Sequence, residues 1–149
     1  MRASHARDTA WAMSQENVET VRRIYEAALR RDAATVLALY DPGVELDASR
    51  IGVSMHPSGG DAYHGHDGLR DLFRDWHEAW GKIEYDYEEL IDAGEEVVAV
   101  VSRHARGRAS GVEVERPFAL LWTLRDGKVI RVVWYLTREE ALEAAGLRE

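Results

Sequence analysis

The side chains best suited to acid–base chemistry in this chain are its six histidines, because imidazole titrates near neutral pH without a perturbed pKa. His104 lies in "EVVAVVSRHARGR", a run typical of a β-strand, so its direction depends on the strand's alternation. If Val98 and Val100 face the core, so does His104. In the opposite alternation Arg103 faces the core and His104 faces solvent. The sequence alone leaves both alternations open.

Three further histidines lie in or beside the glycine-containing loop "SRIGVSMHPSGGDAYHGH". These are His56, His64 and His66, and Asp61 and Asp67 lie close to them in sequence. Their spacing is irregular, and the chain has no cysteine that could supply a thiolate ligand. We therefore predict solvated loop residues and no metal site.

Two tryptophans in "FALLWTLRDGKVIRVVWYL" could form the aromatic wall of a ligand site. The even-numbered residues on both sides of the "RDG" turn are uniformly apolar. A three-residue loop pairs Leu124 with residue 128 and brings both sets to one face, with Trp122 opposite Ile130 and Trp134 opposite Phe118. A two-residue loop separates the two sets. We therefore predict the three-residue loop, and a wall made of Phe118, Leu120, Trp122, Val132, Trp134 and, from the third helix, Trp80.

The odd-numbered face of the same hairpin is half apolar. Its apolar residues are Leu121, Val129, Val133 and Tyr135. A contiguous exposed patch of this kind usually marks a contact with a partner, so we expect a homodimer through this outer face. The alternative is that scattered apolar residues on a surface need no partner.

The elements that must position these residues follow a simple order. Residues 1–13 lack periodicity and predict a flexible extension, with Met13 a possible true start; residues 14–149 form one domain. Three helices are expected, namely "SQENVETVRRIYEAAL", "DAATVLALY" and "DGLRDLFRDWHEAW", with a short strand "VELDA" before the third. Four strands follow, "KIEYDYEEL", "EVVAVVSRHARGR", "VEVERPFALLWTLR" and "KVIRVVWYL".

A last helix is expected after Thr137, which forms a capping box with Glu140, and Gly146 ends it. Segregated helices and strands indicate an α+β fold in which the helices cover one face of an antiparallel sheet.

Composition excludes several functions. The net charge of −8 argues against nucleic-acid binding, which depends on clustered Lys and Arg. No apolar run approaches the roughly 20 residues of a membrane-spanning helix. The N-terminus lacks the apolar stretch of a secretory signal, so a cytoplasmic location is expected.

The combination of "VRRIYEAALRRD", "LYDPGVELDAS", "YHGHDGLRDLF" and "WTLRDGKVIRVVWYLTREEALEAAGL" resembles SnoaL-like proteins of the nuclear-transport-factor-2-like, or ketosteroid-isomerase-like, superfamily. The resemblance covers residues 14 to 147. It implies a cone-shaped, curved sheet wrapped around three N-terminal helices, with a pocket at the open end and a dimer formed through the sheet. It implies little about function, because this fold serves isomerases, cyclases, epoxide hydrolases, dehydratases and binders.

The resemblance also implies site residues. Tyr25 matches the oxyanion-donating tyrosine of the steroid isomerases, and Asp47 is the nearest match to their base if one gap is allowed. Without the gap, Ala48 takes that place and Asp47 points outward. Leu120 stands where the isomerases need a second carboxyl. The Asp–Arg–Asp set of epoxide hydrolases is missing around Arg103.

Together these residues predict that the protein binds a small apolar or aromatic molecule. Asp47 and His104, with Tyr25, would form an acid–base site of the isomerase or cyclase type that needs no cofactor. The alternative is a non-catalytic ligand-binding or dimerisation module.

Overall fold

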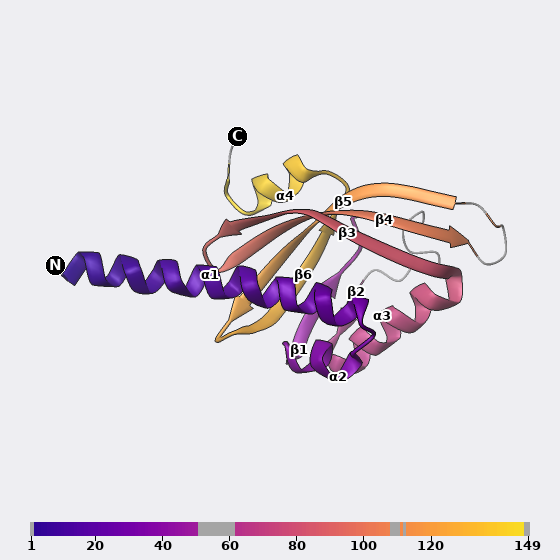
Figure 1. Cartoon of the computed structure of the whole chain (residues 1–149), viewed down its shortest axis with the longest axis horizontal. Coiled ribbons are helices and arrows are strands. Elements are labelled where there is room, and N and C mark those ends of the chain that lie inside the picture. The colour runs from indigo at the N-terminus through magenta and orange to yellow at the C-terminus, as the bar shows by residue number, and fades with distance from the viewer. Residues whose placement is uncertain (1, 51–61, 108–110, 112, 148–149) are drawn as a thin grey trace.

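The computed structural model describes residues 2–50, 62–107, 111 and 113–147, and the side chains of residues 14–50, 62–75, 89–102, 111 and 118–147. The helices in this part of the chain are α1 (Arg2–Leu29), α2 (Ala33–Ala38), α3 (Gly65–Ala79) and α4 (Arg138–Ala144). The strands are β1 (Tyr40–Asp47), β2 (Ala62–His64), β3 (Trp80–Ala93), β4 (Glu96–Gly107), β5 (Glu113–Arg125) and β6 (Lys128–Tyr135). Figure 1 shows α1, α2 and α3 on one side of the strands and α4 on the other.

All six strands form one sheet in the order β2-β1-β6-β5-β4-β3. The strands from β3 to β6 pair antiparallel in sequence order, as the run of four predicted strands requires. The early strand β1 lies beside the last strand β6 and runs parallel to it. The α+β class is therefore confirmed, but the sheet is mixed rather than wholly antiparallel.

The β5–β6 hairpin corrects the predicted loop. Arg125 pairs with Lys128, so the turn is the two-residue Asp126–Gly127, with φ of 53° and 76°. Two positive φ angles define the type I′ turn that fits the twist of antiparallel strands. The register then shifts between Thr123, which pairs with Arg131, and Leu124, which pairs with Val129.

The extra residue in that shift is Ile130, and this bulge reunites the two apolar sets that a two-residue loop would separate. Trp122 lies opposite Val132 rather than Ile130, and Trp134 lies opposite Leu120 rather than Phe118. The predicted partners were wrong, but both tryptophans do lie on the same, helix-facing side of the sheet.

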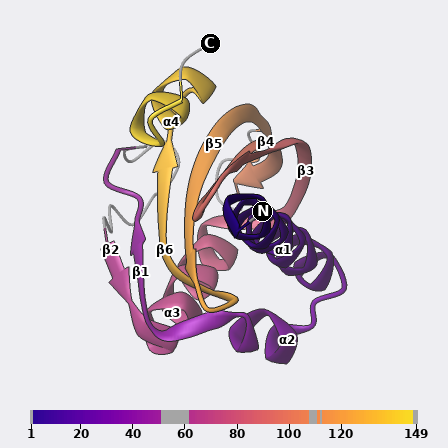
Figure 2. The same ribbon diagram turned by 90° about the vertical axis from the view of Figure 1, so that its left-hand side faces the viewer.

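The main core lies between the helices and the sheet. It joins residues of α1, α2 and α3 with alternate residues of β1, β4, β5 and β6 (Figure 2). Its helical members are Val21, Ile24, Ala27, Val36, Leu69 and Leu72. Leu29, the last residue of α1, does not join this core and is 63% exposed.

A second cluster covers the other face of the sheet. Its buried members are Val98, Ala119, Leu121, Val133, Tyr135, Ala141 and Leu142. The last two belong to α4, and Arg138 of that helix is also joined to Glu89 of β3, with Nε to Oε1 at 2.9 Å. The predicted dimer face is therefore covered by the chain's own C-terminal helix. Val129, also expected there, belongs to the main core instead.

The α4 caps follow the sequence prediction. Thr137 Oγ1 accepts a hydrogen bond from the backbone N–H of Glu140 at 3.1 Å and donates one to its carboxylate at 3.0 Å. Gly146 has φ of 78°, and the N–H of Leu147 donates to the carbonyl of Leu142 at 2.8 Å. This is the Schellman ending that a glycine at this position predicts.

Helix boundaries differ from the prediction at two places. The first helix begins at Arg2, although a loose extension was expected over residues 1–13. Trp80, expected at the end of the third helix, is the first residue of β3. Near the middle of α1, Asn17 links the helix to the β3–β4 turn, since its Nδ2 donates a hydrogen bond to the carbonyl of Gly94 at 3.1 Å.

Candidate ligand-binding side of the sheet

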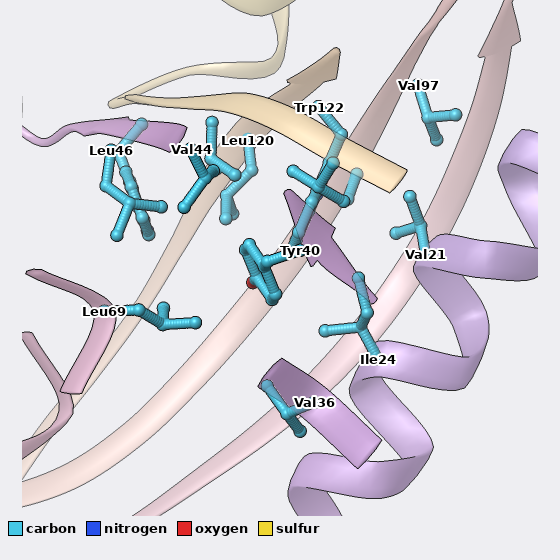
Figure 3. Packing of buried hydrophobic residues seen from close by; sticks show 14 of the residues in the cluster. Val21, Ile24, Val36, Tyr40, Val44, Leu46, Leu69, Val97, Leu120 and Trp122 are labelled. Atoms are coloured by element: carbon cyan, nitrogen blue, oxygen red, sulfur yellow. The ribbon is translucent and has the colours of Figure 1, made fainter. Parts of the chain in front are cut away.

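Three aromatic residues meet on the helix-facing side of the sheet. The ring centroids of Trp122 and Tyr25 lie 5.7 Å apart at an interplanar angle of 75°, an edge-to-face arrangement. The centroid of Tyr40 lies 6.0 Å from that of Trp122. Figure 3 shows Tyr40 and Trp122 in the middle of the main core, between Val44 and Val97. This group of Tyr25, Tyr40 and Trp122 is called the aromatic group below.

The indole N–H of Trp122 is the unusual feature of the aromatic group. The residue is 3% exposed, and its Nε1 is buried without a hydrogen-bond partner in the described structure. A buried donor that lacks an acceptor costs roughly 1–3 kcal/mol, so buried indole N–H groups usually find one. An N–H group left in this state is available to donate a hydrogen bond to an oxygen atom of a ligand.

Tyr40 is held in place by the junction between α2 and β1. Its carbonyl oxygen accepts a hydrogen bond from Nε2 of His66 at 2.9 Å, which anchors the start of α3. The preceding carbonyl, of Leu39, accepts from the N–H of Val129 at 3.0 Å. The apolar pattern predicted Tyr40 as the end of a helix and gave no signal that it is a site residue. The "DPG" that follows it ends the helix earlier than the apolar pattern indicates.

The predicted wall residues share one side of the sheet. Phe118, Leu120, Trp122, Val132 and Trp134 all belong to the main core, and none is more than 5% exposed. The side chain of Trp80 lies outside the described residues. That the others face the helices is confirmed, while their contact with a ligand stays a prediction.

Tyr25 also lies where the sequence placed it. It is half-buried, packs against the main core from α1 and touches Trp122 by its ring. Its position is compatible with contact to a ligand on the helix-facing side.

Asp47 lies on the other side of the sheet. Val44, Leu46 and Ala48 belong to the main core, whereas Asp47 pairs with Val133, a member of the second cluster. This placement agrees with the alignment that has no gap, in which Ala48 takes the inner position. Asp47 was predicted to act as a base on the helix-facing side, and this placement is wrong. Alternate residues of a strand face opposite sides, so Asp47 faces away from the helices.

The charge of Asp47 is stabilised locally. Partial burial acts to raise the pKa of its carboxyl, but hydrogen bonds from Ser49 and the charges of Arg50 and Arg131 outweigh it and lower the pKa below its ordinary value. The N–H and hydroxyl of Ser49 lie 3.0 and 2.6 Å from Oδ1. A carboxylate held ionised in this way is a weak base.

His104 has a defined backbone position, but its side chain lies outside the described residues. The pairing of β4 with β5 runs without a register shift from residue 96 to residue 106. Val97, Ala99 and Val101 belong to the main core and Val98 to the second cluster. The premise that Val98 faces the core is therefore wrong, and position 104 falls in the same alternate set as Val98.

No metal-binding arrangement is present among the residues whose side chains the structure describes, since no three His, Asp or Glu side chains there lie close enough together. His66 is used in the contact with Tyr40, and Asp67 pairs with Arg70 at 2.9 Å. His56 and Asp61 lie outside the described residues. None of the described helices is long and apolar enough to cross a membrane.

Comparisons with known proteins agree with this geometry. The family model of the SnoaL-like domain matches residues 21–132. An NTF2-like protein of unknown function from Burkholderia pseudomallei is similar in structure, with a TM-score of 0.72, 27% identity and coverage of 86% of this chain and 95% of that one.

Two further structures share the fold at lower identity. A putative SnoaL-like polyketide cyclase from Jannaschia has a TM-score of 0.69, 21% identity and coverage of 88% and 91%. TerC, co-crystallised with polyporic acid, has a TM-score of 0.71, 23% identity and coverage of 88% and 98%. No functionally curated protein sequence matches the chain.

Proposed function

The chain belongs to the SnoaL-like family, and from that premise we propose that it binds a small, largely apolar molecule between the helices and the sheet. The observation that carries the proposal is the buried, unpartnered Nε1 of Trp122 within the aromatic group. Apolar walls with a few placed polar groups are typical of small-molecule sites. The ligand should therefore combine a flat apolar body with a hydrogen-bond acceptor.

The relatives support a ligand of this kind without identifying it. TerC was crystallised with polyporic acid, and the Jannaschia protein is a putative polyketide cyclase. Because these proteins share only about a fifth of their residues with this chain, they support a shared scaffold and not a shared substrate.

The catalytic form of the proposal has less support. Isomerase or cyclase chemistry needs a base beside the bound molecule. Asp47 and position 104 both belong to the face of the sheet opposite the main core. Of the three predicted catalytic residues, Tyr25 alone lies on the ligand side, where we assign it a contact role. Binding without turnover is therefore the function we favour.

The test uses two probes of the same shape, 2-acetylnaphthalene and 2-ethylnaphthalene, titrated into the protein by calorimetry. The first carries a carbonyl acceptor and the second does not. We expect the wild type to bind both, with the ketone about fivefold to tenfold tighter, since one hydrogen bond contributes roughly 1 kcal/mol.

The variant Trp122→Phe keeps the aromatic ring and removes the donor, so the two probes should bind it equally. Trp134→Phe, on the same face, is the matched control and should preserve the difference. If neither probe binds the wild type, the proposed function is wrong.

A further inference from the structure

Three consecutive carbonyl groups at the junction of α2 and β1 accept hydrogen bonds from distant parts of the chain. The carbonyl of Ala38 accepts from Nζ of Lys128 at 2.7 Å, and the next one accepts from the backbone of β6. The third, that of Tyr40, accepts from Nε2 of His66 at 2.9 Å. Only this last contact holds a member of the aromatic group.

The contact between His66 and Tyr40 has a defined direction and a long reach. A carbonyl oxygen can only accept, so Nε2 of His66 carries the hydrogen in this contact. The two residues are 26 positions apart in the sequence, and the imidazole is half-buried. The bond therefore joins the start of α3 to the first residue of β1.

The start of α3 is shaped to come this close to β1. Gly65 has φ of 70°, a conformation that favours glycine, and a Cβ added there would lie 3.1 Å from the carbonyl oxygen of Pro42. Because position 65 has no side chain, the first turn of the helix packs directly against the strand. This packing brings the next residue, His66, within reach of the Tyr40 carbonyl.

Tyr40 in turn restricts the indole of Trp122. Their ring centroids lie 6.0 Å apart at an interplanar angle of 51°, and Tyr25 packs edge-to-face on the same indole. Tyr40 is 5% and Trp122 is 3% exposed. Since closely packed core side chains cannot reorient independently, the position of Tyr40 helps to fix the direction of the Trp122 Nε1–H group.

We propose that His66 is a positioning residue that determines specificity: through Tyr40, it holds the indole N–H of Trp122 in the direction that an acceptor on the ligand needs. The inference rests on the proposed function and adds to it a residue outside the aromatic group. A hydrogen bond weakens steeply as its angle departs from linear, whereas apolar contact has no such directional requirement. His66 therefore controls the preference for a ligand with an acceptor more than the affinity for an apolar body.

The test measures the ratio of the affinities for 2-acetylnaphthalene and 2-ethylnaphthalene in variants of His66, by calorimetry as above. His66→Leu removes the donor, and His66→Asn keeps a polar amide that is too short to replace Nε2. In both variants the ratio should fall from about fivefold to tenfold to about twofold or less, because the indole N–H no longer points at the acceptor. The affinity for 2-ethylnaphthalene should change by no more than about twofold.

His66→Gln is the conservative variant. Its amide N–H₂ lies at about the distance of Nε2 from the backbone, so it should restore the ratio of the wild type. A purely structural role of His66 would weaken the binding of both probes together and leave their ratio unchanged. The Asn and Gln variants carry the same comparison if the Leu variant does not fold.

Lys128→Met is the matched control, since it removes the side-chain donor to the carbonyl of Ala38 in the same junction. It should keep the ratio of the wild type, whatever its effect on the melting temperature. Tyr40→Leu tests the route, because it removes the ring through which His66 acts. It should lower the ratio by itself, and adding His66→Leu should lower the ratio no further.

The ligand-free protein provides a spectroscopic readout of the same positioning. An indole held in one packed orientation contributes to the near-UV circular dichroism. The contribution of Trp122 is the difference between the wild type and Trp122→Phe. It should weaken in His66→Leu and return in His66→Gln.

The outcomes separate this inference from the proposed function. If the wild type prefers the ketone and His66→Leu and His66→Asn prefer it equally, His66 does not position the donor, and the binding proposal stands. If His66→Gln fails to restore the ratio, or if His66→Leu lowers it further in the Tyr40→Leu background, the route through the Tyr40 carbonyl is wrong. If no probe binds the wild type, both proposals fail.

Discussion

At the residue scale, Arg31 adopts a backbone conformation that its side chain disfavours. Its φ is 58°, and it follows the end of α1, where its N–H donates to the carbonyl of Ala28 and the N–H of Asp32 donates to that of Ala27. This is the same Schellman ending that Gly146 forms after α4, with arginine in the position that favours glycine.

We expect Arg31→Gly to stabilise the protein by about 0.5–1 kcal/mol. The left-handed conformation costs a residue with a Cβ roughly 1–2 kcal/mol, and the greater freedom of glycine in the unfolded chain offsets part of the gain. Urea denaturation measures the change in the free energy of unfolding. Arg30→Gly, one residue earlier at a negative φ, is the control and should not stabilise.

Asp32 gives a pH dependence with a defined sign. Hydrogen bonds from the hydroxyl and N–H of Thr35 lower the pKa of this carboxyl from 3.8, because they favour its charged form. A lowered folded-state pKa adds stability above the unfolded value, and that stability is lost as the pH falls through the folded value.

Asparagine caps a helix about as well as aspartate but does not titrate. The free energy of unfolding of Asp32→Asn should therefore fall less than that of the wild type as the pH is lowered from about 5 through the acid range in which carboxylates titrate. Parallel curves for the two proteins in chemical denaturation would contradict this assignment.

At the scale of elements, the β5–β6 hairpin depends on two left-handed residues. Gly127 has φ of 76° with no atom within 4 Å of an added Cβ, so a side chain there meets backbone strain and no steric clash. We expect Gly127→Ala to destabilise by about 1 kcal/mol. Asp126→Gly, in the same turn, should change the free energy of unfolding by no more than about 0.5 kcal/mol, since aspartate tolerates this region. Thermal denaturation of both variants tests the pair.

The hairpin also shows how far periodicity determines an element. The alternation of apolar residues correctly predicted that Trp122 and Trp134 share a face. It could not show how they reach it, because a three-residue loop and a two-residue loop with a bulge at Ile130 give the same alternation. The helix caps at Asp32 and Thr137 were predictable because their hydrogen bonds reach only three residues along the chain.

At the scale of the whole molecule, the described apolar part of the outer sheet face is buried within the single chain. Val133 is 3% exposed within a single chain and packs in the second cluster, which α4 covers. The sequence could show that this face is apolar. It could not show that the chain's own last helix returns over it.

Val133→Glu should therefore unfold the single chain rather than separate two chains. A charge without a partner in this cluster should cost about 3 kcal/mol or more. Leu136→Glu is the control, since Leu136 is 37% exposed, and it should have little effect. Circular dichroism during heating and sedimentation velocity together test this. A folded Val133→Glu protein with a lower sedimentation coefficient would instead support the dimer interface.

For the candidate site too, some features follow from the sequence and others only from the tertiary structure. Sequence alone indicated the α+β class, the four strands from β3 to β6, the cap of α4 at Thr137, the place of Tyr25 on the first helix and the shared face of Trp122 and Trp134, because alternation and capping act within one element or one hairpin. The short strand β2 (Ala62–His64) lay inside the predicted loop and was missed. The tertiary structure decided the sides of Asp47 and position 104, through the pairing of β1 with β6 and of β4 with β5. It also decided the meeting of Tyr40 with Trp122 and the covering of Val133. These depend on contacts between segments far apart in the chain, and no local pattern encodes which neighbour each strand or helix will find.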